Sequence, residues 1–412
     1  MKVIVIGGGV IGLSCALFLQ ETGHEVCVID KTDMADGCSY GNAGLVESSL
    51  FVPIPSPGLM IKALKWMLKS DSPFYIKPRL NLSLFKWLWY FYCASTEKHM
   101  ASVIPAYRDL ACLSRTLYLK MFEKLPSVPL SQEGLLILYK TQKAKKDELG
   151  IAEKASNLDI PAQELTPNEV MALNPNISYD ILGGIYYPED LHLTPNHYMA
   201  LLKTYLKNKG VMFNTSQAVL SFHKQGRHLD EVVTEKQTLR ADYFILAAGV
   251  WSQEIANKLS LYLPIEPGKG YHIKTFPKHL PKIPAILSET KIAVTPMGNE
   301  LRLGGTMELS GLNHAFRINR LNAIIRGVQS YFPEMKNIDL SKENIWCGLR
   351  PMPPDGVPYI GKTKHYDNLC IATGHGMRGL SLGLGTGSLI NALISEQTLP
   401  FDINIFSPDR FN

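Results

Sequence analysis

Apolar and polar positions at the start of the chain change their spacing in an order that predicts strand, turn, helix and strand. Val3–Ile6 is a continuous run of β-branched residues, which is typical of a strand buried on both faces. A glycine-rich turn occupies 7–12, and residues 13–23 then show amphipathic helical spacing that ends at Gly23. Residues 25–30 form a second apolar strand. This order is the setting in which a glycine turn binds a dinucleotide.

The rest of the chain alternates short strands and helices. Two helices are predicted to start at Thr166 and Thr194, each followed by proline at the first helical position. Alternating strands fill 263–308. Apolar spacing predicts further helices at 59–68, 82–95, 143–157, 319–331 and 381–395, and further strands at 135–139, 183–187, 211–213, 217–222, 241–247, 357–361 and 369–372.

Strand–helix–strand signals occur in three separated parts of the chain, and mainly antiparallel stretches lie between them. We therefore predict an α/β fold, in which a three-layer, Rossmann-like dinucleotide-binding domain carries an inserted, mainly antiparallel-sheet substrate domain. The boundaries expected for the dinucleotide-binding domain are 1–60, 183–260 and 341–412. Those expected for the substrate domain are 61–182 and 261–340.

The three glycines of the fingerprint spacing have separate uses in the first turn. Gly7 permits the tight turn, Gly9 lets the backbone approach a pyrophosphate, and Gly12 lets the helix pack close to the sheet. The helix N-terminus then offers N–H groups to the phosphates. Asp30 can accept hydrogen bonds from ribose hydroxyls, and its charge disfavours the 2′-phosphate of NADP. The turn alone does not distinguish FAD from NAD.

The composition narrows the class of protein. Of 412 residues, 46% are hydrophobic and 19% are charged, which excludes a disordered chain, and a net charge of +5 is too small to indicate nucleic-acid binding. The seven cysteines form no CxxC pair and the eleven histidines form no HxxxH pair, so we expect reduced thiols and no metal site. Glycines interrupt the apolar N-terminus, which argues against a signal peptide. No apolar run approaches the ~20 residues of a spanning helix, so a cytoplasmic protein is expected.

Aromatic residues gather in one segment outside the glycine motifs. Three of the five tryptophans stand at positions 66, 87 and 89. The simplest interpretation of residues 66–92 is a helical layer packed on the core. The alternative is a lid over the site, or a surface that touches a membrane or a partner.

Six motifs in order along the chain make it resemble the FAD-dependent D-amino-acid oxidase superfamily, which includes glycine and sarcosine oxidases and the D-amino-acid dehydrogenases. The stretches 58–92 and 267–271 resemble the D-amino-acid dehydrogenase branch in particular, including flavoproteins that oxidise D-hydroxyproline. Two positions depart from the family pattern: Asp30 stands where Glu is commoner, and Arg378 where many relatives look apolar. The motifs are GGGVIG (7–12) with Asp30, GCSYGNAG (37–44), LAAGVWS (246–252), RLGGTME (302–308), GLRPMPPDGVPYIG (348–361) and ATGHGMRGLSLG (372–383).

The resemblance implies non-covalently bound FAD and the residues that hold it. The glycines near 374–379 would bring backbone N–H groups to the flavin pyrimidine oxygens, and Val219 would hold the adenine through backbone groups. Cys347 is expected to be a buried structural thiol. The full set expected to bind the cofactor is Gly7, Gly9, Val10, Ile11, Gly12, Asp30, Lys31, Ser39, Asn42, Ala43, Gly44, Val219, Ala248, Gly249, Trp251, Gly348, Gly374, Gly376, Met377, Gly379, Leu380 and Ser381.

The resemblance also implies that the substrate is an amino acid whose Cα hydride passes to flavin N5. Arg350, in the GLRP element, is expected to bind the substrate carboxylate, because a planar guanidinium makes two parallel bonds to it. Tyr271 would donate its phenol to the same carboxylate or close the site; the alternative is a half-buried strand tyrosine. Arg378 would stabilise the reduced flavin or bind a second acidic group, unless it is a surface arginine remote from the flavin. His375 is expected near the flavin, and no general base is assigned.

Three hypotheses for the function follow. The first is a D-amino-acid dehydrogenase that gives an imino acid and passes electrons to a quinone or another carrier, docking at the inner face of the cytoplasmic membrane through the aromatic segment. The second is a glycine-, sarcosine- or proline-type amine oxidase that reduces O2. The third is a flavin-binding subunit that assembles with partner chains and is not itself catalytic.

Overall fold

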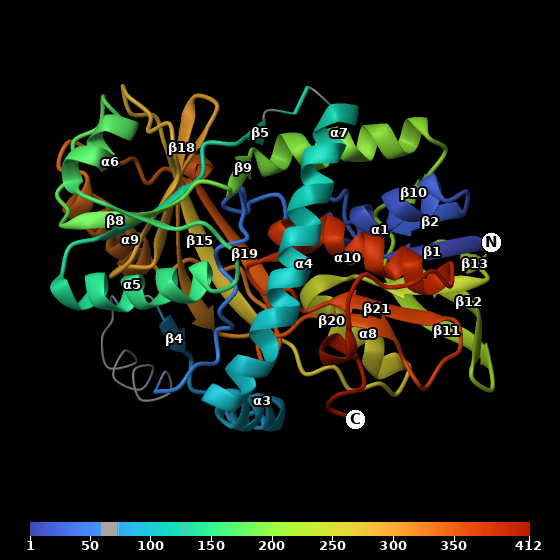
Figure 1. Cartoon of the computed structure of the whole chain (residues 1–412). Coiled ribbons are helices and arrows are strands. Elements are labelled where there is room, and N and C mark those ends of the chain that lie inside the picture. Colours follow the sequence, from blue (N-terminus) through green and yellow to red (C-terminus); the bar gives the residue numbers. More distant parts are fainter. Residues whose placement is uncertain (59–71, 73, 126, 129) are drawn as a thin grey trace.

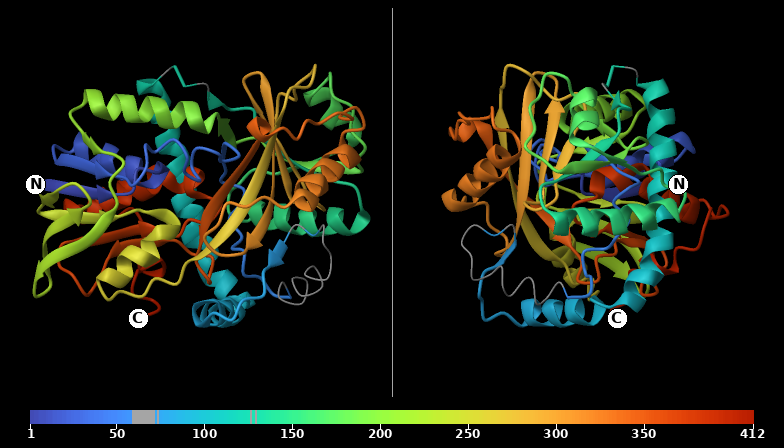
Figure 2. Two further views of the ribbon diagram at one scale, coloured as in Figure 1. Left: turned by 180° about the vertical axis from the view of Figure 1, so that it is seen from behind. Right: turned by 60° about the vertical axis from the view of Figure 1, so that its left-hand side comes forward.

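The computed structural model describes residues 1–58, 72, 74–125, 127–128 and 130–412. The helix expected at 59–68 lies outside these residues. Figure 1 shows a first region on the right, a mainly parallel sheet with its helices, and a second region on the left, built on a large sheet. The long helix α4 (Glu97–Lys124) packs against the last helix, α10, at the side of the molecule, and α3 (Leu82–Ala94) lies at its N-terminal end, which the views of Figure 2 also show.

A six-stranded sheet forms the middle layer of the first region. β1 pairs in parallel with both β2 and β14, so the first strand of the chain lies between strands that are about 20 and 240 residues away in sequence. The order is β10 (Met212–Asn214), β2 (Glu25–Ile29), β1 (Lys2–Ile6), β14 (Tyr243–Leu246), β21 (Leu369–Thr373) and β20 (Tyr359–Lys362).

The two faces of this sheet bury different partners, because successive side chains of a strand point to opposite sides. Val3 and Val5 pack with the helices α1 (Val10–Glu21), α4, α7 (Pro195–Asn208) and α10 (Gly379–Ile394). Ile4 and Ile6 pack against the three-stranded sheet of β11 (Val219–Gln225), β12 (His228–Thr234) and β13 (Thr238–Arg240). The structure therefore confirms the expected three layers. α8 (Ser252–Lys258) follows the 3₁₀ turn η1 (Gly249–Trp251).

Helix α10 approaches α1 at backbone distance. A Cβ added at Gly387 would overlap the carbonyl of Ser14, and one added at Gly383 would crowd the Ser14 hydroxyl. Glycine at these positions lets the last helix of the chain contact the first, and α10 is buried along nearly its whole length.

The second region is built on a nine-stranded, mainly antiparallel sheet. β4 (Phe74–Ile76) pairs with β18. α9 (Ile318–Tyr331) and α6 (Pro167–Leu173) pack on one face of the sheet, and α5 (Gln142–Ser156) packs on the other. The order of the other strands is β19 (Ile345–Met352), β15 (Glu266–Thr275), β18 (Glu300–Leu309), β17 (Ile292–Met297), β16 (Ala285–Leu287), β6 (Leu135–Tyr139), β8 (Gly183–Tyr187) and β7 (Gln163–Leu165). A small sheet of β3 (Leu45–Val46), β9 (Leu191–Leu193) and β5 (Leu130–Ser131) lies beside α10.

Strand pairing corrects two of the expected boundaries. β8 and β19 were expected in the dinucleotide-binding segments 183–260 and 341–412, but both are strands of the nine-stranded sheet. A strand belongs to the sheet that satisfies its hydrogen bonds, and these two find their partners in the inserted segments. The rest of the domain division stays a prediction.

Candidate functional site

A cavity of about 490 Å³ lies where the six-stranded sheet meets the large sheet. Its walls come from widely separated parts of the chain. The main ones are the first glycine turn, residues 29–42, residues 217–219, the segment 247–255, residues 348–351 of β19, and residues 372–380 at the start of α10. Most residues expected to bind the cofactor line it: Gly7, Gly9, Val10, Ile11, Asp30, Lys31, Ser39, Asn42, Val219, Ala248, Gly249, Trp251, Gly348, Gly374, Gly376, Gly379 and Leu380.

The first glycine turn leaves no room for side chains. Gly7 has φ +111°, and a Cβ there would overlap the carbonyl of Ala247, the residue after β14. A Cβ on Gly12 would overlap the carbonyl of Gly7, so Gly12 allows α1 to begin directly against the turn although it does not itself line the cavity. The N–H of Val10, at the start of α1, donates to the Ser39 hydroxyl at 3.0 Å, which fixes the loop 37–44 over the helix N-terminus.

Asp30 closes one side of the cavity with both of its oxygens engaged. The N–H of Gly8 donates to Oδ2 at 2.7 Å, and the N–H of Thr32 donates to Oδ1 at 2.9 Å. Sequence reasoning missed the part that Gly8 plays here, because the fingerprint spacing passes over it. Next to Asp30, the ammonium of Lys31 lies 3.4 Å from the ring centroid of Trp251, so these two residues form one wall together.

The opposite end of the cavity is made by the turn before α10. Gly374 and Gly376 have φ of +78° and +56°, a region that favours glycine, and the N–H of Gly376 donates to the carbonyl of Pro351 at 3.0 Å. His375 is buried between them, with Nε2 2.9 Å from the Thr386 hydroxyl and Nδ1 without a partner. Burial lowers the pKa of His375 to about 3, so its imidazole is neutral.

Arg350 lies on β19 between two residues that line the cavity, Leu349 and Pro351. Its side chain is half-buried, and burial lowers the pKa of the guanidinium. Nη1 donates to the carbonyl of Thr306 at 2.7 Å. In the part of the chain that the structure describes, no carboxylate pairs with it. Burial raises the pKa of the Cys38 thiol, which lies in the cavity wall, and the positive charge of Arg350 acts in the opposite direction. The guanidinium is therefore close enough to that wall to affect its electrostatics.

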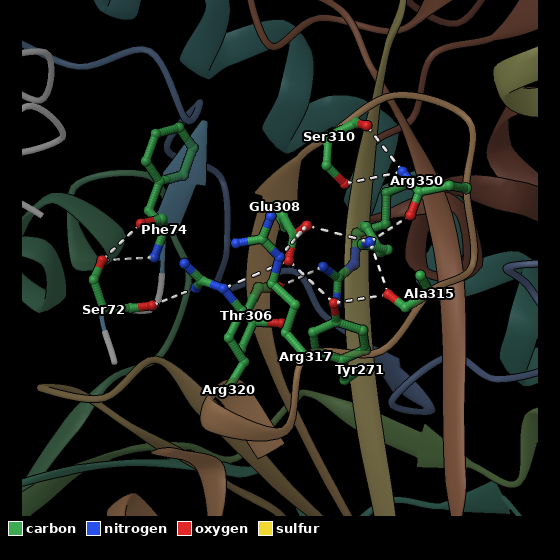
Figure 3. Close-up of polar contacts among 12 residues, drawn as sticks. Ser72, Phe74, Tyr271, Thr306, Glu308, Ser310, Ala315, Arg317, Arg320 and Arg350 are labelled. Atoms are coloured by element: carbon green, nitrogen blue, oxygen red, sulfur yellow. Dashed lines mark hydrogen bonds and ion pairs between the residues drawn. The ribbon is translucent and has the colours of Figure 1, made fainter. Parts of the chain in front are cut away.

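The structure does not bring Tyr271 to Arg350, contrary to expectation. Tyr271 faces Cys347 across β15 and β19, whereas Arg350 faces Gly268, so the two side chains point to opposite faces of the sheet. The phenol donates to Glu308 at 3.0 Å, in the cluster drawn in Figure 3. Its neighbour Lys269 forms an ion pair with the same carboxylate, so both side chains belong to the buried face of the sheet on which α9 packs.

Arg378 also lies apart from the cavity. Its Nη2 donates to the carbonyl of Val52, and its guanidinium stacks 4.7 Å from the ring centroid of Tyr107. Arg378 is the residue before α10 and is not one of the residues that line the cavity, so the role near the flavin that the resemblance implies stays a prediction. Four other expected cofactor residues do not line the cavity: Ala43, Gly44, Met377 and Ser381.

Two side chains from the large sheet hold the loop 37–44 from outside the cavity. His272 Nδ1 bonds the carbonyl of Gly41 at 3.0 Å, and Arg302 Nη1 donates to the carbonyl of Asn42 at 2.7 Å. Trp346 stacks on His272 with ring centroids 5.0 Å apart, and a Cβ on Gly41 would overlap the Trp346 ring. No pattern along the chain predicts these contacts, because they depend on how the two sheets meet.

The cavity fits FAD. Side chains at Gly7 or Gly12 would overlap the backbone, so the glycine turn leaves room for a phosphate group to approach it. The N-terminus of α1 faces the same cavity, and the carboxylate of Asp30 stands after β2, where a ribose would bind. Within the described residues no group of histidine, cysteine and carboxylate side chains could hold a metal ion. In the same residues no helix is both long and apolar enough to span a membrane.

Known proteins resemble this chain in sequence and in fold. D-amino acid dehydrogenase of Helicobacter pylori is 31% identical over 398 residues, covering 96% of this chain and 95% of that protein. The D-amino acid dehydrogenase of Neisseria meningitidis serogroup C (strain 053442) is 32% identical over 424 residues, covering all of both. Glycine oxidase from Geobacillus kaustophilus shares the fold, with a TM-score of 0.81, 21% identity and 99% of each chain covered. L-Proline dehydrogenase from P. horikoshii does so with a TM-score of 0.80, 18% identity, and 100% and 97% covered.

A family model described as FAD dependent oxidoreductase matches residues 2–393. The match runs from the first strand of the chain to the end of α10, and so includes every wall of the cavity. It confirms the resemblance seen in the glycine motifs, and with it the expectation that FAD is the cofactor. The chain belongs to the family of FAD-dependent oxidoreductases, and the protein is an enzyme of that family.

Proposed function

We propose that this enzyme oxidises D-amino acids to imino acids. The observation that carries the proposal is Arg350, a half-buried guanidinium with no carboxylate partner among the described residues, beside a cavity that fits FAD. A cation held partly out of water without a counter-ion favours an anionic ligand. The relatives named D-amino acid dehydrogenase, which match over essentially the whole chain, support the choice of substrate class.

In this proposal the protein binds and orients, and the cofactor carries the redox chemistry. Arg350 binds the substrate carboxylate through guanidinium N–H groups that Thr306 leaves free, which fixes Cα relative to the cavity. When bound, FAD would supply the two-electron acceptor that the oxidation of the amino acid requires. The neutral imidazole of His375 adds no charge to the cavity wall.

A flavin-reduction screen tests the substrate class. The purified holoenzyme is mixed anaerobically with D- and L-amino acids, glycine, sarcosine and hydroxyproline isomers, and loss of flavin absorbance is followed by stopped flow. We expect D-isomers to reduce the flavin faster than their L-enantiomers. Reduction by glycine or sarcosine alone would contradict the proposal, and no reduction by any amine would favour the non-catalytic subunit.

The carboxylate role of Arg350 has its own test. Arg350→Ala should raise the KM for a D-amino acid at least a hundredfold, since charged hydrogen bonds to a carboxylate contribute about 1.5–3 kcal/mol each. The FAD content of the variant, measured by its absorbance ratio, should be unchanged because Arg350 does not line the cavity. An unchanged KM would refute this assignment.

We propose further that electrons leave to a membrane quinone, and that α3 contacts the membrane surface. Five large apolar side chains at this end of the molecule are each more than half exposed: Leu80, Leu82, Phe85, Trp89 and Tyr92. Residues 74–95 contain no acidic side chain, while Lys77 and Lys86 are exposed. An amphipathic helix with exposed aromatic residues and lysines favours an anionic lipid surface.

Vesicle sedimentation tests this surface. The protein should sediment with vesicles that contain phosphatidylglycerol, and Trp89→Ser should weaken the association severalfold. Leu220→Ser is the matched control, because Leu220 is also exposed but lies on β11. Equal loss in both variants would contradict the proposal, as would rapid peroxide formation in air, which would identify O2 as the acceptor.

A further inference from the structure

The guanidinium of Arg350 rests on a glycine of the neighbouring strand. β15 and β19 pair with Gly270 opposite Gly348, and a Cβ added at Gly270 would overlap Cζ, Nη1 and Nη2 of Arg350. The φ of Gly270 lies outside the left-handed region, so its backbone conformation does not require glycine. Because Gly270 has no side chain, space is left above its Cα, and the guanidinium of Arg350 occupies that space.

The strand on the other side of Gly270 is bulged at the same place. Lys269 pairs with Glu308 and Tyr271 pairs with Gly305, so the two residues Thr306 and Met307 of β18 stand opposite Gly270 alone. An extra residue in one strand re-aims its backbone groups. Here the bulge turns the carbonyl of Thr306 toward Nη1 of Arg350, at 2.7 Å.

Thr306 has a conformation that its side chain does not favour. Its φ is +67°, in the left-handed region that is a clear outlier for a β-branched residue. Its hydroxyl is buried and has no hydrogen-bond partner. The left-handed φ and the unpaired hydroxyl do not stabilise the strand. The hydrogen bond that Arg350 donates to the Thr306 carbonyl, in contrast, depends on the bulge. Strain of this kind is concentrated at functional sites.

We propose that Gly270 and Thr306 are positioning residues that fix the direction of the Arg350 guanidinium. Gly270 lets it lie flat against the strand, and the Thr306 carbonyl engages one N–H of Nη1. The remaining donors, on Nη2 and Nε, then face a substrate carboxylate in one orientation. This deepens the proposed function and rests on it, because it assumes that Arg350 binds the substrate carboxylate.

Gly270→Ala is the direct test, with Gly304→Ala as its control. A Cβ at Gly304 on β18 meets open space, whereas one at Gly270 displaces the guanidinium. We expect Gly270→Ala to raise the KM for a D-amino acid at least tenfold and to change kcat less than threefold. It should weaken binding of benzoate, followed through the flavin spectrum, by a similar factor, and leave the FAD content unchanged. Gly304→Ala should change none of these quantities.

Thr306→Gly provides a second variant that does not add a side chain. Glycine accepts φ +67° without strain, so the melting temperature should not fall, but the freed backbone no longer fixes the carbonyl. We expect a severalfold higher KM at unchanged kcat. If Arg350→Ala raises the KM but Gly270→Ala and Thr306→Gly do not, the positioning role is refuted while the proposed function stands. If Arg350→Ala itself leaves the KM unchanged, the proposed function fails instead.

Discussion

Replacing Glu308 with glutamine removes the carboxylate that pairs with Lys269, Arg317 and Arg320 in the cluster of Figure 3. Glu308 is 1% exposed and lies 3.2 Å from Lys269, 3.4 Å from Arg317 and 3.5 Å from Arg320 (Figure 3). Lys269 and Arg320 are themselves only 2% and 3% exposed. Burial tends to raise the pKa of Glu308, but a hydrogen bond from Ser310 and the charge of Lys269 outweigh it, and the pKa lies below its ordinary value. Glu308 is therefore ionised.

Glu308→Gln would leave two buried cations without a counter-ion. Removing one partner of a buried ion pair costs about 3–5 kcal/mol of unfolding free energy. With an unfolding entropy of about 2.1 cal/mol/K per residue over 412 residues, this corresponds to a melting temperature about 4–6 °C lower if the chain unfolds as one unit. Differential scanning calorimetry of the holoenzyme at pH 7.5 measures it.

Two variants make this test specific. Asp367→Asn removes the carboxylate of the exposed pair with Arg227, in which both side chains are more than 60% exposed, and should change the unfolding free energy by less than about 1 kcal/mol. Adding Lys269→Met to Glu308→Gln should restore part of the loss, because it removes one of the unpaired charges. A melting temperature for Glu308→Gln within 1 °C of the parent would refute the reasoning.

Three further outcomes are expected. Gly12→Ala should release FAD on gel filtration, because its Cβ would overlap the Gly7 carbonyl, whereas Gly150→Ala, where a Cβ meets open space, should retain it; equal retention would contradict this. Asp30→Ala should weaken FAD binding at least tenfold, about 1.4 kcal/mol, by fluorescence titration, since Asp30 organises the turn and the ribose end. Burial lowers the pKa of His192 to about 4 and that of His272 and of His375 to about 3. The unfolded state therefore binds more protons between these values and ~6.5, and stability should fall as pH drops below ~6.5. His272→Gln should make that fall shallower in melting curves from pH 4.5 to 8, and an unchanged slope would refute it.

The parts of the fold that depend on adjacent residues could be predicted from the sequence. The strand, turn and helix at 3–21 follow from β-branched residues, glycines and apolar spacing, although the helix begins at Val10, three residues earlier than expected, and ends at Glu21. Thr166 and Glu169 likewise form a capping box at the start of α6, where a helix was predicted to begin. These signals are local, so a single sequence carries them.

Features that depend on strand register could not be predicted. Arg350 and Tyr271 both lie in motifs, but whether they meet depends on which residues pair across β15 and β19. Because the side-chain period of a strand is two, a shift of one residue would exchange their faces. The contacts of His272 and Arg302 with the loop 37–44 depend on the meeting of two sheets. No spacing along the chain encodes that meeting.

The contact between the first and the last helix has a consequence for synthesis of the protein. α1 cannot complete its packing until α10 exists, and residues 372–380 form one wall of the cofactor cavity. At 5–20 residues per second, roughly 20–80 s pass between the appearance of the glycine turn and that of its last wall. During that interval the nascent chain carries a phosphate-binding turn but no complete site. FAD capture should therefore follow release of the finished chain, and the bound fraction in a cell would report how much of the protein has folded to its C-terminal end.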